Sequence, residues 1–231
     1  MIKGCIFDYG GTLDTGGQHW GMVIWHAYEQ LHVPVSEEAF RAAYVHAERT
    51  LGKNPIIQAD FTFRRTLEEK LRLQLDYLQQ TSHLSSHTSY LLPLTSYLYK
   101  ATQTETSRSR KVLLKLRERY PMVLVSNFYG NIATVLKEFE FEGLFQTIIE
   151  SAVVGVRKPD PRIFTLGVEA LDLKPEEVVV IGDSMDKDII PAHKAGCRTV
   201  WFKGEGWTDA PVDESIPDMI ITSLEQLLSK V

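Results

Sequence analysis

The stretch that decides the fold is residues 2–14, which read IKGCIFDYGGTLD. Its first half is mostly apolar and lacks the strict alternation of a half-exposed strand, which is typical of a central strand buried on both faces. The run then ends abruptly in Asp8, Gly10, Gly11 and Asp14. Because open parallel sheets bind ligands beyond the carboxyl ends of their strands, this stretch predicts a first strand that leads directly into a site.

Short apolar runs of the same kind recur in the second half of the chain. They lie at residues 2–7, 122–125, 178–181 and 199–202, with weaker candidates at 147–150 and 219–221. Helical stretches at 132–139, 161–171 and 189–195 lie between the later runs, and each is followed by a turn signal. This alternation predicts an α/β fold with a Rossmann-like, doubly wound parallel sheet.

A helical block separates the first strand from the second. Helical periodicity dominates residues 16–104, with Ser36 as an N-cap, an amphipathic helix over 61–80 and a loop over 81–89 that is rich in Ser, Thr and His. We expect an inserted helical cap domain at 16–104, on a core domain formed by 1–15 and 105–231. Such an insertion is suited to act as a lid.

Composition excludes several classes of protein. The chain has 231 residues and a net charge of −5 without a basic block, which makes nucleic acid a poor partner. Cys5 and Cys197 lie in or beside apolar runs and are expected to be buried thiols. No apolar stretch approaches the roughly 20 residues that span a bilayer, and a strand begins at the N-terminus where a signal peptide would lie. We therefore expect a cytoplasmic protein that does not bind membranes; the sequence leaves its oligomeric state open.

Residues with catalytic chemistry follow several of the predicted strands. Asp8 follows the first, Ser126 and Asn127 the second, and Asp183 and Asp188 the strand at 178–181, while Lys158 lies in the loop after 147–150. Each alone has an ordinary explanation as a turn, capping or surface residue. Because all of these residues follow strands of one predicted sheet, together they predict a site that contains carboxylates, a hydroxyl and a lysine.

Such a set suits phosphoryl transfer. Clustered carboxylates repel one another unless a cation lies among them, and Mg²⁺ prefers oxygen ligands and shares a substrate phosphate. Lys158 would supply positive charge at the transferred group, and Ser126 with the backbone N–H groups near Gly10 and Gly11 would hold phosphoryl oxygens. A carboxylate such as Asp8 can act as the nucleophile through an aspartyl-phosphate.

The order of these motifs resembles the haloacid dehalogenase (HAD) superfamily, most of whose members are Mg²⁺-dependent phosphohydrolases. The resemblance covers the whole chain and includes Val-Leu-Val-Ser126-Asn127, Arg157-Lys158-Pro159-Asp160-Pro161 and Gly182-Asp183-Ser184. It implies that Asp8 is the nucleophile and that Lys158 bridges it to the phosphoryl group. The implied metal ligands are Asp8, Gly10 through its carbonyl, Asp183 and Asp188; the implied substrate-binding residues are Gly10, Gly11, Thr12, Ser126, Asn127 and Lys158.

One position departs from the family pattern. Phosphatases of this family carry a second Asp two residues after the nucleophile, which protonates the leaving oxygen, and here that position is Gly10. General acid–base catalysis contributes ~10²–10⁴-fold, so hydrolysis of ordinary phosphate esters is expected to be slow. Asp14 is the nearest spare carboxylate in the sequence.

Three hypotheses remain at this stage. The first is a phosphatase or phosphotransferase on a small phosphorylated metabolite, favouring good leaving groups such as acyl phosphates. The second is a related hydrolase without phosphatase activity: Asp183 argues against a dehalogenase, whereas a phosphonoacetaldehyde hydrolase would use a cap lysine, for which Lys53 is a candidate. The third is a catalytically weakened binding or regulatory protein. His19, His26, Arg49, Arg64 and Arg65 are interpreted as packed or solvated helix residues.

Overall fold

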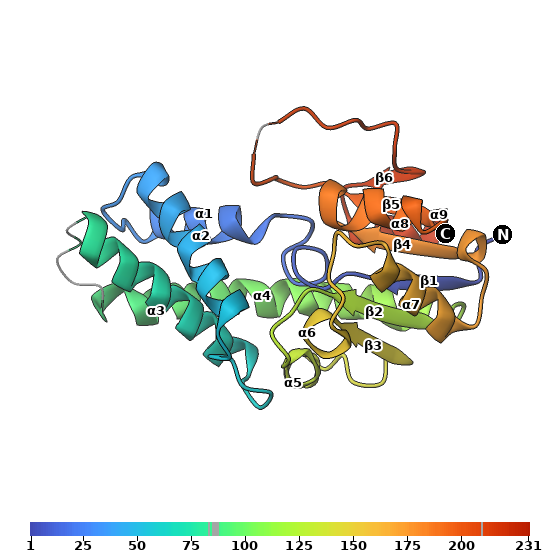
Figure 1. The fold of residues 1–231 in the computed structure, drawn as a ribbon, viewed down its shortest axis with the longest axis horizontal. Helices are drawn as coiled ribbons and strands as arrows, with labels where there is room; N and C mark the ends of the chain where they lie inside the picture. The colour runs from blue at the N-terminus through green and yellow to red at the C-terminus, as the bar shows by residue number, and fades with distance from the viewer. Residues whose placement is uncertain (83, 85–87, 209) are drawn as a thin grey trace.

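The computed structural model describes residues 1–82, 84, 88–208 and 210–231 and shows a parallel sheet beside a group of helices (Figure 1). Within these residues the sheet has six strands in the order β3-β2-β1-β4-β5-β6, and every neighbouring pair is parallel. The strands are β1 (Gly4–Phe7), β2 (Met122–Ser126), β3 (Thr147–Glu150), β4 (Val178–Gly182), β5 (Arg198–Phe202) and β6 (Met219–Ile221). The predicted doubly wound α/β sheet is confirmed, with strand bounds within two residues of those expected.

Helices follow most strands. Those after β2 are α5 (Ile132–Glu138), α6 (Ser151–Val154), α7 (Arg162–Leu171), α8 (Ile190–Lys194) and α9 (Leu227–Lys230), with short turns η1 (Pro175–Glu177), η2 (Met185–Ile189) and η3 (Leu224–Gln226). The helix expected at 189–195 is therefore shorter, because η2 forms a π-helical turn ahead of it.

Both faces of the sheet are buried, which explains the apolar strands. Ile6 belongs to one buried cluster with Ile163 and Phe164 of α7, whereas its neighbour Phe7 belongs to a second cluster with Leu113. Successive side chains of a strand point to opposite faces, so a strand covered on both sides needs apolar residues at every position.

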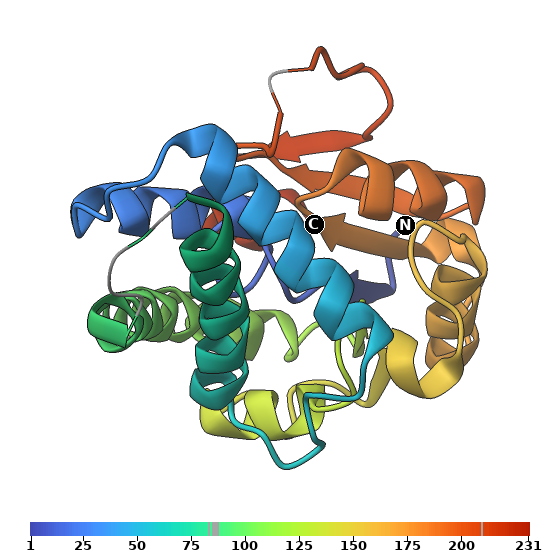
Figure 2. The same cartoon turned by 60° about the vertical axis from the view of Figure 1, so that its left-hand side comes forward.

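Among the described residues between β1 and β2 there are four helices: α1 (Trp20–Gln30), α2 (Glu37–Lys53), α3 (Phe63–Ser82) and α4 (Thr88–Leu116). Ser36 caps α2 as predicted, since its side chain accepts a hydrogen bond from Ala39 N. The helices α2 and α3 pack against each other beside the sheet (Figure 2). Of the loop predicted at 81–89, residues 83 and 85–87 lie outside the described residues, while 81–82 belong to the end of α3 and 88–89 to the start of α4.

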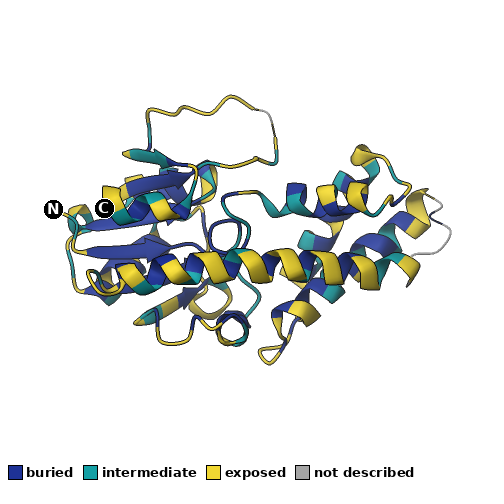
Figure 3. Cartoon of the chain, turned by 180° about the vertical axis from the view of Figure 1, so that it is seen from behind, coloured by how far each residue is buried: buried dark blue, intermediate teal, exposed yellow. Residues whose placement is uncertain are grey.

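The helix α4 passes through the expected domain boundary at residue 104 and continues without a break to Leu116. Its hydroxyl residues are poor helix formers, but three threonines bond back to carbonyls of their own helix: Thr106 Oγ1 to Thr102 O and Thr95 Oγ1 to Leu91 O, each over 2.8 Å, and Thr104 Oγ1 to Lys100 O over 3.0 Å. These satisfied hydroxyls allow Thr95 and Thr106 to be buried. Figure 3 shows α4 buried along one side and exposed along the other.

Two further expectations concern cysteines and membranes. Cys5 and Cys197 are both buried free thiols, as predicted. Within the part of the chain that the structure describes, no helix has the length and apolar character needed to cross a bilayer.

Candidate active site

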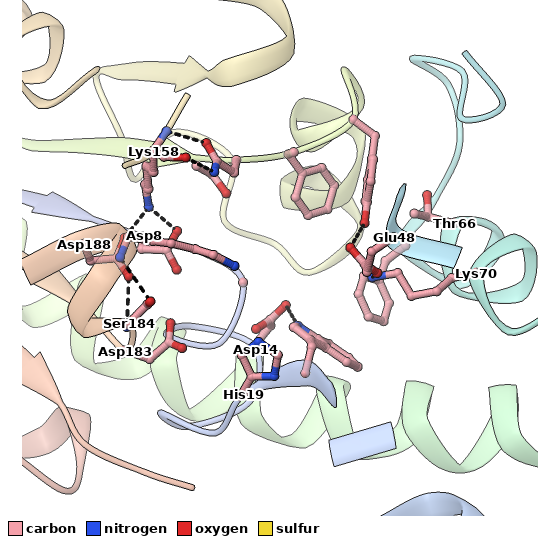
Figure 4. A pocket seen from close by; sticks show the side chains of 18 of the residues that line it. Asp8, Asp14, His19, Glu48, Thr66, Lys70, Lys158, Asp183, Ser184 and Asp188 are labelled. Carbon is pink, nitrogen blue, oxygen red and sulfur yellow. Dashed lines mark hydrogen bonds and ion pairs between the residues drawn. The ribbon is translucent and has the colours of Figure 1, made fainter. Parts of the chain in front are cut away.

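The predicted site residues meet at the carboxyl edge of the sheet. Asp8 follows β1, which pairs with β2 on one side and β4 on the other, so Ser126 and Asp183 lie at neighbouring strand ends. A cavity of about 150 Å³ opens there, and Figure 4 shows its lining. Among the predicted site residues, the lining includes Asp8, Gly10, Ser126, Asn127, Lys158, Asp183 and Asp188, and it also contains Asp14.

Lys158 is the cation at the centre of this edge. Its Nζ lies 2.6 Å from Asp8 Oδ1 and 2.6 Å from Asp188 Oδ1, and its side chain is only 2% exposed. Burial lowers the pKa of Lys158, but the two carboxylates outweigh it and raise that pKa above the ordinary value. Asn127 fixes the backbone of Lys158 with two hydrogen bonds, one accepted and one donated by its amide.

Thr12 and Gly11 bring the Asp183 carboxylate to Asp8. The Thr12 hydroxyl lies 3.1 Å from Asp8 Oδ2 and 3.0 Å from Asp183 Oδ1, and it accepts a hydrogen bond from Asp183 N. Gly11 has a φ of +100°, and a Cβ there would overlap the Asp183 carboxylate. Only glycine therefore fits this close approach.

Three carboxylates form a compact cluster. One oxygen each from Asp8, Asp183 and Asp188 lies within 4.8 Å of the others. Burial raises the pKa of Asp8 to about 6 despite the opposing effect of Lys158. Burial, with the charges of Asp188 and Asp8, raises the pKa of Asp183 well above its usual range. One lysine does not neutralise three carboxylates, so the cluster carries an excess of two negative charges when ionised.

Ser126 presents an unsatisfied polar atom at the same edge. Its Oγ is buried and has no hydrogen-bond partner among the described residues. A buried hydroxyl without a partner carries a desolvation cost that a ligand oxygen can relieve.

Asp14 lies in the same cavity but belongs to a different network. Its Oδ1 accepts a hydrogen bond from Gly11 N over 2.7 Å, and its Oδ2 accepts one from Trp20 Nε1 over 3.0 Å. Burial raises the pKa of Asp14 to about 7, despite these two hydrogen bonds. A Cβ on Gly10 would lie 3.9 Å from Trp20 Cδ1, so a side chain at position 10 would begin beside the indole that holds Asp14.

The inserted helices supply the opposite end of the cavity. Glu48 of α2 and Lys70 of α3 form an ion pair of 2.8 Å, and the Tyr129 hydroxyl donates a 2.9 Å hydrogen bond to Glu48 Oε2. Sequence reasoning missed all three. Glu48 and Lys70 are single polar residues on amphipathic helices and look like solvated surface, and Tyr129 lies in the loop after β2. The signal that existed was a charged residue at a half-buried position of each helix.

Other residues weighed from the sequence lie elsewhere. Lys53 ends α2 and lines a second, separate hollow together with Arg49, so the structure does not bring it to Asp8. Arg64 and Arg65 are exposed on α3. His19 caps α1 and lines the main cavity, where burial lowers its pKa to about 4.

Comparison with known families agrees with this geometry. The model of the haloacid dehalogenase-like hydrolase family matches residues 2–196. A parallel sheet whose first strand delivers a buried aspartate to a lysine and two further carboxylates defines a hydrolase of this type. The chain belongs to the haloacid dehalogenase-like hydrolase family.

Similar curated proteins carry phosphatase names. A glyceraldehyde 3-phosphate phosphatase of Pyrococcus furiosus is 33% identical over 129 residues, which is 54% of this chain and 53% of that protein. A phosphoserine phosphatase of Thermus thermophilus is 35% identical over 36% of this chain and 32% of its own length. The chain thus spans about half or less of these relatives. A phosphoglycolate phosphatase of Vibrio vulnificus is 25% identical over 100% of this chain and 96% of that protein.

Solved structures share the fold. A dehalogenase structure superposes with a TM-score of 0.67 at 19% identity, covering 100% of this chain and 97% of its own. YfnB of Bacillus subtilis, solved bound to magnesium, gives a TM-score of 0.61 at 17% identity, covering 99% of this chain and 97% of its own. At such identities the likeness establishes the α/β architecture alone.

Proposed function

We propose that the protein is a Mg²⁺-dependent phosphohydrolase that acts on a small phosphorylated metabolite through a covalent intermediate on Asp8. The observation that carries this proposal is the contact of Lys158 Nζ with Asp8 and Asp188 at 2.6 Å, beside the third carboxylate of Asp183. Phosphatase names among the relatives support it.

The residues present fit a magnesium ion. Three carboxylates with oxygens within 4.8 Å of one another supply hard ligands, and their excess of two negative charges equals the charge of the ion. We assign Asp8, Asp183 and Asp188 as the side chains that would hold it, with the Gly10 carbonyl as a backbone ligand. The ion would neutralise charge on the transferred phosphoryl group.

The residues of the chain divide the reaction into two steps. An Asp8 carboxylate oxygen attacks phosphorus, the bond from phosphorus to the leaving oxygen breaks, and an aspartyl-phosphate forms. Water then attacks that phosphorus, releases inorganic phosphate and restores the Asp8 carboxylate. Lys158 and Ser126 bind phosphoryl oxygens in both steps, with Asn127 and the backbone N–H of Gly10 beside them. The Gly11 N–H and the Thr12 hydroxyl are engaged by Asp14 and by the Asp8 and Asp183 carboxylates, so they hold the loop in place.

The proton for the leaving oxygen needs a source, because Gly10 has no side chain. Among the described carboxylates that line the cavity, Asp14 is the one that belongs neither to the acidic cluster nor to an ion pair. We assign to Asp14 the donation of this proton and its recovery from the attacking water. Burial that raises its pKa to about 7 suits both halves of this task at neutral pH.

We also propose that residues 16–104 act as a cap that closes the cavity over a core of residues 1–15 and 105–231. Cap residues on α2 and α3 line the cavity opposite Asp8, which supports a role in choosing the substrate. Carbon–phosphorus cleavage through Lys53 is not favoured, since Lys53 lines a different hollow.

Incubation with acetyl phosphate and Mg²⁺, with released phosphate and intact protein mass measured together, tests the proposal. We expect release of phosphate and a transient added phosphoryl mass, both lost in Asp8→Asn. As a matched control, Asp186→Asn changes an exposed aspartate of η2 and retains both signals. No adduct and no release from a protein shown to bind Mg²⁺ would reject phosphoryl transfer through Asp8.

A further inference from the structure

The end of the cavity remote from the acidic cluster is formed by an ion pair between Glu48 and Lys70. Figure 4 shows Glu48 and Lys70 on the opposite side of the cavity from Asp8 and Lys158, and all four line it. A phosphoryl group held at Asp8 would direct the rest of its substrate toward this end. The side chains there therefore contact the leaving group rather than the phosphate.

Glu48 and Lys70 are both charged, and each neutralises the other. Burial raises the pKa of Glu48, but Lys70 outweighs it and holds that pKa below its usual range. In turn, burial lowers the pKa of Lys70, whereas Glu48 raises it well above the ordinary value. A lysine held in its protonated form is not an amine nucleophile, so Lys70 does not replace Lys53 as a carbonyl-binding residue.

The pair leaves one donor and spare acceptor capacity available. Glu48 Oε2 accepts from Tyr129, and Glu48 Oε1 is paired with Lys70 Nζ at 2.8 Å. Lys70 carries three N–H donors, of which Glu48 and the Tyr129 hydroxyl engage two, and each carboxylate oxygen of Glu48 has a second lone pair. A hydroxyl group, which both donates and accepts, matches such a site.

The charge of the whole cavity disfavours a second anion. Its described lining contains five carboxylates and three lysines. With the proton assigned to Asp14, the lining has an excess of one negative charge, and a bound Mg²⁺ and the phosphate dianion of the substrate offset each other and leave that excess unchanged. A carboxylate on the leaving group would add a further charge near Glu48, where the nearest cation is already paired.

We propose that Glu48, Lys70 and Tyr129 form a subsite that selects phosphate monoesters with an uncharged, hydroxylated leaving group and rejects those whose leaving group carries a carboxylate. This inference rests on the phosphatase function proposed above.

A matched pair of substrates tests the subsite. Glycerol 3-phosphate and 3-phosphoglycerate differ chiefly in one CH₂OH group that is a carboxylate in the second. We expect the native protein to show a kcat/KM at least about tenfold higher for glycerol 3-phosphate, because a like charge beside Glu48 is costly. Phosphoserine, which adds an ammonium group to the carboxylate, is measured beside them.

The variant Glu48→Gln removes the charge that neutralises Lys70. We expect the preference for glycerol 3-phosphate to fall by about tenfold or more, mainly through faster turnover of 3-phosphoglycerate, since the cation is then free to bind a carboxylate. Glu68→Gln makes the same change on α3 outside the cavity and keeps the native ratio. Thermal unfolding of both variants confirms that they are folded.

The possible outcomes distinguish a failure of the proposed subsite from a failure of the proposed phosphatase function. Turnover that depends on Asp8 but prefers 3-phosphoglycerate, phosphoglycolate or phosphoserine would overturn the subsite alone. An unchanged ratio in a folded Glu48→Gln protein would do the same. Absence of Asp8-dependent turnover on acetyl phosphate and on every ester would overturn the phosphatase function and the subsite with it. The ratio in the native protein is decisive even if Glu48→Gln fails to fold.

Discussion

Trp20 Nε1 donates a 3.0 Å hydrogen bond to Asp14 Oδ2, and the same indole lies about 4 Å from the place of a Cβ on Gly10. The Trp20 indole therefore lies beside both the Asp14 carboxylate and the place of a side chain at position 10. If Asp14 is the acid, as proposed above, the acid lies four residues further along the first loop and still lines the cavity.

The variant Asp14→Asn is expected to separate substrates by their leaving group. Alkoxide leaving groups need a proton, so kcat for glycerol 3-phosphate should fall by about 10²-fold. Acetyl phosphate has a carboxylate leaving group that needs none, so its formation of the Asp8 adduct should change by less than about threefold. The burst of phosphorylation by acetyl phosphate measures formation of the adduct, and steady-state phosphate release measures kcat for glycerol 3-phosphate. An equal loss on both substrates would contradict a proton-transfer role.

The variant Gly10→Asp is expected to fold, because the nearest atom to the new Cβ is an ordinary 3.9 Å away. A second carboxylate near Trp20 should raise kcat for glycerol 3-phosphate by about tenfold, and by about 10²-fold when Asp14→Asn is also present. Gly10→Asn is the control, since it fills the same space without an acid. Rescue by both Asp and Asn would show a packing effect instead.

Replacement of Lys158 by methionine should damage both stability and activity. Asp8 and Asp188 would keep buried charges without their partner, which typically costs ~3–5 kcal/mol of unfolding free energy. Loss of the phosphoryl contact should lower kcat by about 10²–10³-fold. Lys3→Met is the control, because the Lys3–Glu177 pair has the same 2.6 Å distance but lies at the surface. Denaturant unfolding with equal losses for both variants would contradict the assignment.

Ser126→Ala should lower activity without lowering stability. Its Oγ has no partner among the described residues, so removal should leave the unfolding midpoint unchanged or slightly higher. The lost hydrogen bond to a phosphoryl oxygen should lower kcat/KM by about 10- to 100-fold. Ser109→Ala, a buried serine of α4 outside the cavity, should keep native kinetics. Native kinetics in Ser126→Ala would contradict phosphate binding by this residue.

Without metal, stability should fall as the pH rises. Burial raises the pKa of Asp8 to about 6 and of Asp14 to about 7, against an ordinary value of 3.8. The folded protein therefore binds these protons more tightly than the unfolded chain, and the free energy of unfolding decreases between about pH 4 and pH 7. In EDTA the melting temperature should be lower at pH 8 than at pH 5, and Mg²⁺ should raise it more at pH 8. A rise with pH in EDTA would contradict the raised pKa values.

The sheet could be predicted from the sequence because burial on both faces requires an apolar residue at nearly every strand position. The register ends β1 one residue before Asp8, next to the ends of β2 and β4 that carry Ser126 and Asp183, and that neighbourhood follows from strand order once the parallel fold is assumed. The cap end of the cavity could not be predicted. Glu48, Lys70 and Tyr129 are distant in sequence, and their contact depends on how α2 and α3 pack over the loop after β2.

The course of α4 was missed for a different reason. Its hydroxyl residues have low helix propensity, so the sequence does not indicate that a helix continues past the expected boundary at residue 104. The structure satisfies those hydroxyls against carbonyls one turn earlier, a compensation that composition does not reveal.

The unbroken course of α4 limits how the protein can be dissected. An excision that joins Thr15 to Glu105 would start the second half of the chain in the middle of a helix, and Thr106 would lose the Thr102 carbonyl that accepts its hydroxyl. The inserted helices therefore cannot be removed or exchanged at residues 15 and 105 without cutting α4. A shortened enzyme would have to keep the helix from Thr102 onward, with a new N-cap before it, to preserve the surface that Leu113 and Leu116 present to the sheet.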